Sequence, residues 1–225
     1  MKHHEMMALG LTSEHLAEMG GVLMHEKAAE AFRILQTRAG QAGFQLAVAS
    51  GYRSYERQLA IFNSKWGGER PVLDENDRVL VRQHHSAEEW LHRILRFSAL
   101  PGTSRHHWGT DIDIFDPTRI PPDESLQLIP SEYHIGGIFE DVTRWLDELI
   151  ASSDCEGFFR PYDRDRGGVS EEPWHLSYEP VASTLRPFLT ADSLRDLWRA
   201  DPGLRPHGYE IILPLLDELM DRYVV

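Results

Sequence analysis

Residues 102–116 read GTSRHHWGTDIDIFD, a stretch that brings two adjacent histidines, two glycines and three aspartates together. Its second half alternates polar and apolar residues, which is typical of a β-strand because successive side chains of a strand point to opposite faces. We therefore expect Asp111 and Asp113 to share one face, and the neighbouring isoleucines to anchor the other face in a core. His106 precedes this strand in a loop that the glycines allow to turn tightly. An imidazole and a carboxylate placed in this way are two candidate ligands for a divalent metal.

The composition limits the class of protein and the kind of metal site. The chain has 225 residues, of which 41% are hydrophobic and 26% charged, enough for a substantial core. Its net charge of −13 argues against nucleic acid as a partner, since binding to phosphate backbones depends on clustered lysine and arginine. Cys155 is the single cysteine, so an internal disulfide and a cysteine-rich zinc knuckle are both excluded. Any zinc site must therefore use histidine and carboxylate ligands.

The N-terminal sequence determines our expectation for the compartment. It lacks an uninterrupted apolar segment followed by a cleavage site, as a secretory signal would have. No window approaches the roughly 18 apolar residues of a membrane span. We expect a cytoplasmic protein without a membrane span. A periplasmic or cell-wall location fits equally well if a signal has been removed.

Hydrophobic periodicity predicts a series of helices and short strands in one domain over residues 1–225, without repeats or a linker. Predicted helices cover residues 12–42, 55–66, 86–97, 137–152 and 181–225, the last with breaks at its prolines. Predicted strands cover residues 44–50, 110–115, 157–162 and 171–178, the last two as an antiparallel hairpin. The irregular residues 67–85, with a short hairpin, and the helix that follows form a block at 67–97, which is either a lid over the site or an ordinary surface insertion.

Three residues stand apart from the many scattered histidines and carboxylates as a candidate metal site. His106, Asp113 and His175 form a set of two nitrogen ligands and one oxygen ligand, which in catalytic zinc sites leaves a position open for water. Glu172 lies three residues before His175 and is a candidate general base for that water. The alternative for each residue is a satisfied structural polar group.

Arginine and glutamine near a strand-to-helix turn are candidates for binding the substrate. Arg53 follows the predicted strand at residues 44–50, Ser54 is placed to cap the next helix, and Gln58 lies one turn into it. A guanidinium offers a planar fork of donors, which suits either a substrate carboxylate or a developing oxyanion. Ser104 can add a hydroxyl near the same carboxylate.

The motifs SxHxxGxxxD at 104–113, EPWH at 172–175 and GYRSYxxQ at 51–58 together resemble a known family. They are similar to those of the D-alanyl-D-alanine carboxypeptidase family of the VanY type, within the zinc peptidases that include lysostaphin-type enzymes and the hedgehog domain. The resemblance covers about residues 44–178, with the helices of 12–42 and 181–225 packed on that core. It implies an α+β fold, with a small, mainly antiparallel sheet that carries the zinc site and helices packed around it.

The resemblance also implies a role for each candidate residue. One zinc ion per chain would be held by His106, Asp113 and His175, with Glu172 as general base. Arg53 would contact the terminal carboxylate of the substrate or the oxyanion. Further contacts to the peptide are predicted for four residues: Gln58, Ser104, Trp174 and Tyr178.

Two positions depart from the family pattern. Asp111 stands where the family usually has a small residue such as alanine, and it can compete as a ligand or weaken the binding of anionic substrates. His107 adds a second imidazole beside His106, although the spacing to Asp113 favours His106 as the ligand.

We therefore expect a zinc-dependent carboxypeptidase that removes the C-terminal D-amino acid from peptidoglycan-type peptides, with a cell-wall stem peptide as its partner. One alternative is a zinc-stabilised binding module that has lost catalysis, against which Glu172 and Arg53 both argue. The other is an endopeptidase that cuts crosslinked wall, which requires an open cleft. The sequence does not fix the oligomeric state.

Overall fold

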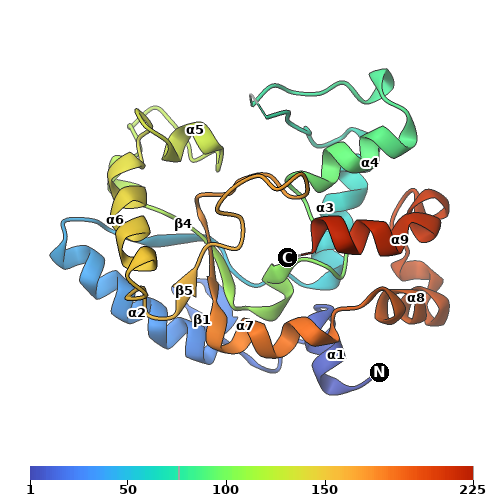
Figure 1. Cartoon of the computed structure of the whole chain (residues 1–225), viewed down its shortest axis with the longest axis horizontal. Helices are drawn as coiled ribbons and strands as arrows, with labels where there is room; N and C mark the ends of the chain where they lie inside the picture. The colour runs from blue at the N-terminus through green and yellow to red at the C-terminus, as the bar shows by residue number, and fades with distance from the viewer. Residues whose placement is uncertain (76, 225) are drawn as a thin grey trace.

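A four-stranded antiparallel sheet carries the acidic stretch near its centre, and helices surround it (Figure 1). The computed structural model describes residues 1–75 and 77–224. The strand order is β3 (Ala47–Ser50), β4 (Asp111–Phe115), β6 (His175–Tyr178) and β5 (Phe158–Phe159). This arrangement confirms the predicted α+β class.

The register of the sheet places the polar residues of β4 beside those of its neighbours. Asp113 pairs with Ser50 of β3 and with His175 of β6, while Asp111 pairs with Ser177. The isoleucines of β4 are fully buried in a hydrophobic core on the other face. The predicted alternation along this strand is therefore confirmed.

The remaining elements are helices and one further hairpin. The α-helices are α1 (His3–Ala8), α2 (Glu26–Gln41), α3 (Tyr55–Gly67), α4 (Ala87–Leu95), α5 (Pro130–Tyr133), α6 (Glu140–Ala151), α7 (Glu179–Leu185), α8 (Ala191–Ala200) and α9 (Tyr209–Tyr223). Short 3-10 turns include η2 (Arg105–Trp108) just before β4. None of the helices within the described ranges has both the length and the apolar character needed to cross a membrane.

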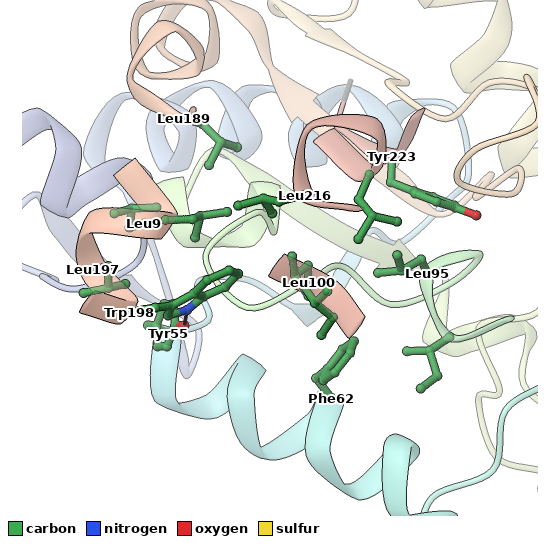
Figure 2. Packing of buried hydrophobic residues seen from close by; sticks show 14 of the residues in the cluster. Leu9, Tyr55, Phe62, Leu95, Leu100, Leu189, Leu197, Trp198, Leu216 and Tyr223 are labelled. Atoms are coloured by element: carbon green, nitrogen blue, oxygen red, sulfur yellow. Dashed lines mark hydrogen bonds between the residues drawn. The ribbon is translucent and has the colours of Figure 1, made fainter. Parts of the chain in front are cut away.

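Two hydrophobic clusters hold these elements together. One joins β4 and β6 to α2 and α6, which lie on the same side of the molecule in Figure 1. The other joins α3 and α4 to α7, α8 and α9, and Figure 2 shows its side chains. Within it, Trp198 Nε1 donates to the Tyr55 hydroxyl at 2.7 Å, and that hydroxyl donates to the Leu204 carbonyl at 2.7 Å. The second cluster fixes α3, which carries one wall of the site described below.

The prediction of a helix over residues 12–42 is wrong in its first half. Residues 16–25 form a hairpin of β1 (Leu16–Met19) and β2 (Val22–His25), and only α2 is helical. Gly20 and Gly21 both have positive φ, at 60° and 89°. Two such residues make the tight turn whose twist matches antiparallel strands, so this glycine pair joins two strands rather than two helices.

Elsewhere most predicted elements are found with shorter bounds, while the helix predicted over residues 55–66 extends one residue further, to Gly67. Ser54 caps α3 by accepting a hydrogen bond from the Arg57 amide, and Ser86 and Glu89 form the predicted capping box of α4. The strand predicted over residues 157–162 is only two residues long, but it pairs with β6 as expected. In the irregular residues 67–85, a short hairpin was predicted, and the structure has an isolated antiparallel bridge between Leu73 and Val79 there.

Gly109 is expected to be intolerant of a side chain. Its φ is +69°, and a Cβ would lie 2.8 Å from the His25 amide nitrogen, which donates to the Gly109 carbonyl at 2.7 Å. Gly109→Ala should therefore lower the free energy of unfolding by about 1–3 kcal/mol. Urea unfolding would measure the change. In contrast, Gly40→Ala in α2 meets nothing within 4 Å and should stabilise the protein by up to about 1 kcal/mol. Equal effects of the two substitutions would contradict this account.

Candidate active site

Three separate elements bring the predicted metal ligands together. His106 lies on η2, Asp113 on β4 and His175 at the start of β6, and one ligand atom from each lies within 4.8 Å of the others. His106 Nε2 is 3.3 Å from Asp113 Oδ2, and His175 Nδ1 is 3.3 Å from Asp113 Oδ1. The cross-strand pairing of Asp113 with His175 accounts for the second of these distances.

Hydrogen bonds on the far side of each imidazole set which nitrogen faces the site. His106 Nδ1 donates to the Gly51 carbonyl at 2.9 Å, and His175 Nε2 donates to Asp111 Oδ1 at 2.9 Å. The opposite nitrogens therefore have lone pairs that point toward Asp113. Asp113 Oδ1 and His175 Nδ1 are buried without a hydrogen-bond partner among the described residues. Because buried polar atoms are rarely left unpaired, this set fits a bound cation, and its N, N, O chemistry fits zinc.

Glu172 lies beside the metal ligands. Its Oε2 is 3.2 Å from His175 Nδ1, and its side chain lines the same cavity. The backbone positions it: its amide donates to the Tyr162 carbonyl at 3.0 Å, and its own carbonyl accepts from the His175 amide at 3.0 Å. A carboxylate at this distance can reach a water molecule that shares the site with His175.

Asp111 binds the outer side of His175 and does not join the ligand set. It is fully buried, and besides His175 it accepts hydrogen bonds from three groups: Arg105 Nε at 2.8 Å, the Thr110 hydroxyl at 2.6 Å and the Ser177 hydroxyl at 3.0 Å. Burial alone would raise the pKa of Asp111, but the Arg105 guanidinium and the hydrogen bond from His175 hold it well below its ordinary value. Asp111 is thus a charged group that orients His175.

His107 is a buried structural residue. Its Nδ1 donates to the Arg53 carbonyl at 2.6 Å, and its Nε2 accepts from the Gly102 amide at 3.1 Å. Desolvation lowers the pKa of His107 to about 3, so the ring is neutral. Both nitrogens are occupied, which leaves His106 as the histidine of η2 that faces Asp113.

Arg53 and Ser104 line the cavity, whereas Gln58 supports Arg53 from behind. Gln58 is fully buried and accepts from Arg53 Nη1 at 2.9 Å, and its own amide donates to the Ala99 carbonyl at 2.6 Å. Arg53 Nη2 also donates to the Ser50 hydroxyl at 3.2 Å. These contacts hold the guanidinium at the cavity wall, so Gln58 acts through Arg53 and is not among the lining residues.

The two predicted aromatic contacts differ in position. Trp174 lines the cavity and packs against Tyr133 with 5.5 Å between ring centroids. Tyr178 packs against Phe158 at 5.4 Å and is not among the residues that line the cavity. The structure therefore brings Trp174, but not Tyr178, to the other site residues.

The cavity has a volume of about 440 Å³. One wall is α3, and parts of the others are residues 70–73 and 127–130. Figure 1 shows the loop before α4 extending toward α5, and the Ser131 hydroxyl donates to Asp77 Oδ2 at 3.0 Å between these two segments. Residues of the irregular insertion thus form part of the cavity wall, as expected of a lid.

Comparison with known proteins places this site in a family. The model of the family "VanY: D-alanyl-D-alanine carboxypeptidase" matches residues 21–181, well over half of the chain. The chain belongs to the VanY family. The match includes β2, the whole four-stranded sheet and all the candidate site residues.

Individual relatives agree with the VanY assignment. An uncharacterized protein of Haemophilus influenzae is 34% identical over 126 residues, which cover 56% of this chain and 93% of that protein. A D-alanyl-D-alanine carboxypeptidase of Enterococcus faecalis is 32% identical over 142 residues, 62% of this chain but only 42% of that protein.

A solved structure of VanYB in complex with D-alanine-D-alanine has a TM-score of 0.53 at 24% identity, with 77% of this chain and 81% of the other covered. A VanY mutant in complex with Zn(II) has a TM-score of 0.51 at 23% identity, with 80% and 93% covered. At this identity the two structures support the fold.

Three further residues of the cavity in this VanY-family chain were not predicted from sequence. Lys65, Arg70 and Tyr162 all line it. The available signal for Lys65 was helical spacing, because it lies seven residues after Gln58 and so on the same face of α3. Arg70 and Tyr162 lie in irregular segments, where no periodicity indicates direction.

Proposed function

We propose that this protein is a zinc-dependent carboxypeptidase that removes the C-terminal D-amino acid from peptidoglycan-type peptides. The observation that carries the proposal is the convergence of the His106, Asp113 and His175 ligand atoms with Glu172, 3.2 Å from His175, in one cavity that Arg53 also lines. Membership of the VanY family supports it, as does the curated relative named D-alanyl-D-alanine carboxypeptidase. The VanYB structure contains D-alanine-D-alanine, which has the same chemistry as the C-terminal end of the proposed substrate.

The carboxylate end of the substrate is assigned to Arg53 and Ser104. Arg53 lines the cavity and is already held by hydrogen bonds to Gln58 and Ser50. A guanidinium pre-organised in this way loses little side-chain entropy when it binds a carboxylate. Ser104 precedes η2 and lines the same part of the cavity, so its hydroxyl can donate to the same group.

Glu172 performs the proton transfers of hydrolysis. His106, Asp113 and His175 would hold the zinc ion, which would supply Lewis acidity to a water molecule and to the scissile carbonyl. Glu172 takes a proton from the attacking water as the water oxygen bonds to the carbonyl carbon, and delivers it to the leaving amine as the carbon–nitrogen bond breaks. The products are the shortened peptide and one free amino acid, with no other reactant needed.

The insertion favours an exopeptidase over an endopeptidase. Residues 70–73 and Asp77 line the cavity, and the hydrogen bond from Ser131 to Asp77 joins the insertion to the segment beside α5. A cavity walled in part by this insertion suits a chain end better than the middle of a crosslinked strand. Glu172 and Arg53 argue against a silent binding module, which needs neither a base nor a carboxylate clamp.

Metal removal tests the proposal. A D-Ala-D-Ala-terminated stem pentapeptide should release D-alanine, a chelator should abolish the release, and one equivalent of zinc per chain should restore it. Amino-acid analysis together with metal quantification of the same sample would measure this. Zinc binding without release from any D- or L-terminated peptide would favour the binding module, and fragments from intact wall sacculi would favour the endopeptidase.

A further inference from the structure

The cavity contains more positive charge than the proposed reaction uses. Arg53, Lys65 and Arg70 all line it, although the chain as a whole has a net charge of −13. Arg53 is assigned to the terminal carboxylate of the substrate. Lys65 and Arg70 have no role in the steps described above.

The fold directs Lys65 into the same space as Arg53. Ile61 and Lys65 both line the cavity and lie on the face of α3 that also carries Gln58, at spacings of three and seven residues. Trp90 Nε1 and the Gly68 amide both donate to the Lys65 carbonyl, at 3.1 Å each, so the backbone at this end of α3 is fixed. At about 1.5 Å per residue, Lys65 lies roughly 10 Å along the helix from Gln58. That distance corresponds to about three residues of an extended peptide.

Lys65 has no counter-charge of its own. Within residues 1–75 and 77–224, no carboxylate forms an ion pair with Lys65 or Arg70. Asp77 lines the same cavity but accepts a hydrogen bond from Ser131, while Glu172 and Asp113 belong to the candidate metal site. Desolvation, followed by the charge of Arg70, lowers the pKa of Lys65 to about 8, and Glu172 opposes this shift. The ammonium is therefore still mostly protonated at neutral pH, but partly stripped of water, and such a group favours a bound anion.

We propose that Lys65, with Arg70 beside it, binds a side-chain carboxylate of the substrate, so that the enzyme selects acidic peptides with such a residue within about three positions of the scissile bond. This inference rests on the proposed function, because it assumes that the peptide enters the cavity that contains Glu172 and Arg53. The anion belongs to the substrate rather than to a separate ligand, because Lys65 and the metal ligands line one continuous cavity of about 440 Å³.

Paired peptides test this selectivity. Each pair ends in D-Ala-D-Ala and differs only by glutamate or glutamine at one of the three preceding positions. The wild-type protein should show a kcat/KM at least about tenfold higher for the glutamate member at one position, as expected for a charge-assisted hydrogen bond. Lys65→Met should bring that ratio close to 1, mainly through KM, and Lys65→Arg should retain most of it. Lys27→Met, at an exposed lysine of α2, should keep the wild-type ratio.

Binding measured without turnover separates this inference from the proposed function. The same pairs are titrated calorimetrically into zinc-loaded Glu172→Gln protein, with and without Lys65→Met. A Kd ratio that favours glutamate and depends on Lys65 supports the subsite even if the wild-type protein releases no amino acid, a result that would refute only the carboxypeptidase. Equal Kd and kcat/KM values within every pair would overturn the subsite, and so would a preference that survives Lys65→Met.

Discussion

Replacing Glu172 with glutamine is expected to reduce kcat for release of the terminal D-alanine by about 10²–10⁴-fold, the usual contribution of a general base. The amide has nearly the same shape but cannot accept the proton of the attacking water. Zinc content should stay at one per chain, because the proposed ligands are His106, Asp113 and His175. Single-turnover assays and metal analysis of the same preparation would measure both quantities.

The neighbouring Glu171 provides a matched control. Its side chain is 38% exposed and pairs with His134 at 3.2 Å, and it is not among the residues that line the cavity. Glu171→Gln should leave kcat within about twofold of wild type, since surface ion pairs contribute little. If Glu172→Gln retained a tenth or more of wild-type kcat, or if both substitutions had equal effects, Glu172 would not be the base.

The convergence of the metal ligands was predictable because strand geometry constrains it. A period of two assigns Asp111 and Asp113 to one face of β4, and pairing with β6 brings Asp113 next to His175. From sequence, His106 was favoured over the adjacent His107 only by its spacing to Asp113. That distinction depends on contacts distant in sequence, since the Gly51 carbonyl fixes His106 and the Arg53 carbonyl binds His107.

The predictions differ from the structure at residues whose role depends on contacts with residues elsewhere in the fold. Tyr178 was expected to contact substrate, but it packs against Phe158 of the adjacent β5 and is not among the residues that line the cavity. The apolar residues of the β1–β2 hairpin also fit a helical stripe, whereas the positive φ of Gly20 and Gly21 lets the chain turn back and pair as two strands. Lys65 was missed because a lysine near the end of a helix is normally solvated, and its place in a cavity wall follows from tertiary packing.

Asp111→Ala is expected to weaken both the metal site and the fold. Removal of the carboxylate deprives His175 Nε2 of its acceptor at 2.9 Å, so the ring loses the contact that directs Nδ1 toward Asp113. Loss of such an outer partner typically weakens metal affinity about 10–100-fold. The same substitution removes the carboxylate that lies 2.8 Å from the buried Arg105 guanidinium, which should lower the free energy of unfolding by about 3–5 kcal/mol. Competition with a chromophoric chelator and urea unfolding of the metal-free protein would measure the two effects separately.

A double variant distinguishes the two roles of Asp111. In Asp111→Ala with Arg105→Leu both charges of the buried pair are absent, and replacement of such pairs by apolar residues is often close to neutral for stability. Most of the lost stability should therefore return, whereas zinc affinity should remain low because His175 still lacks its acceptor. If zinc affinity also returned, the effect of Asp111 on the metal would come only from the unpaired charge of Arg105. Persistence of the low affinity would instead establish that Asp111 orients a metal ligand.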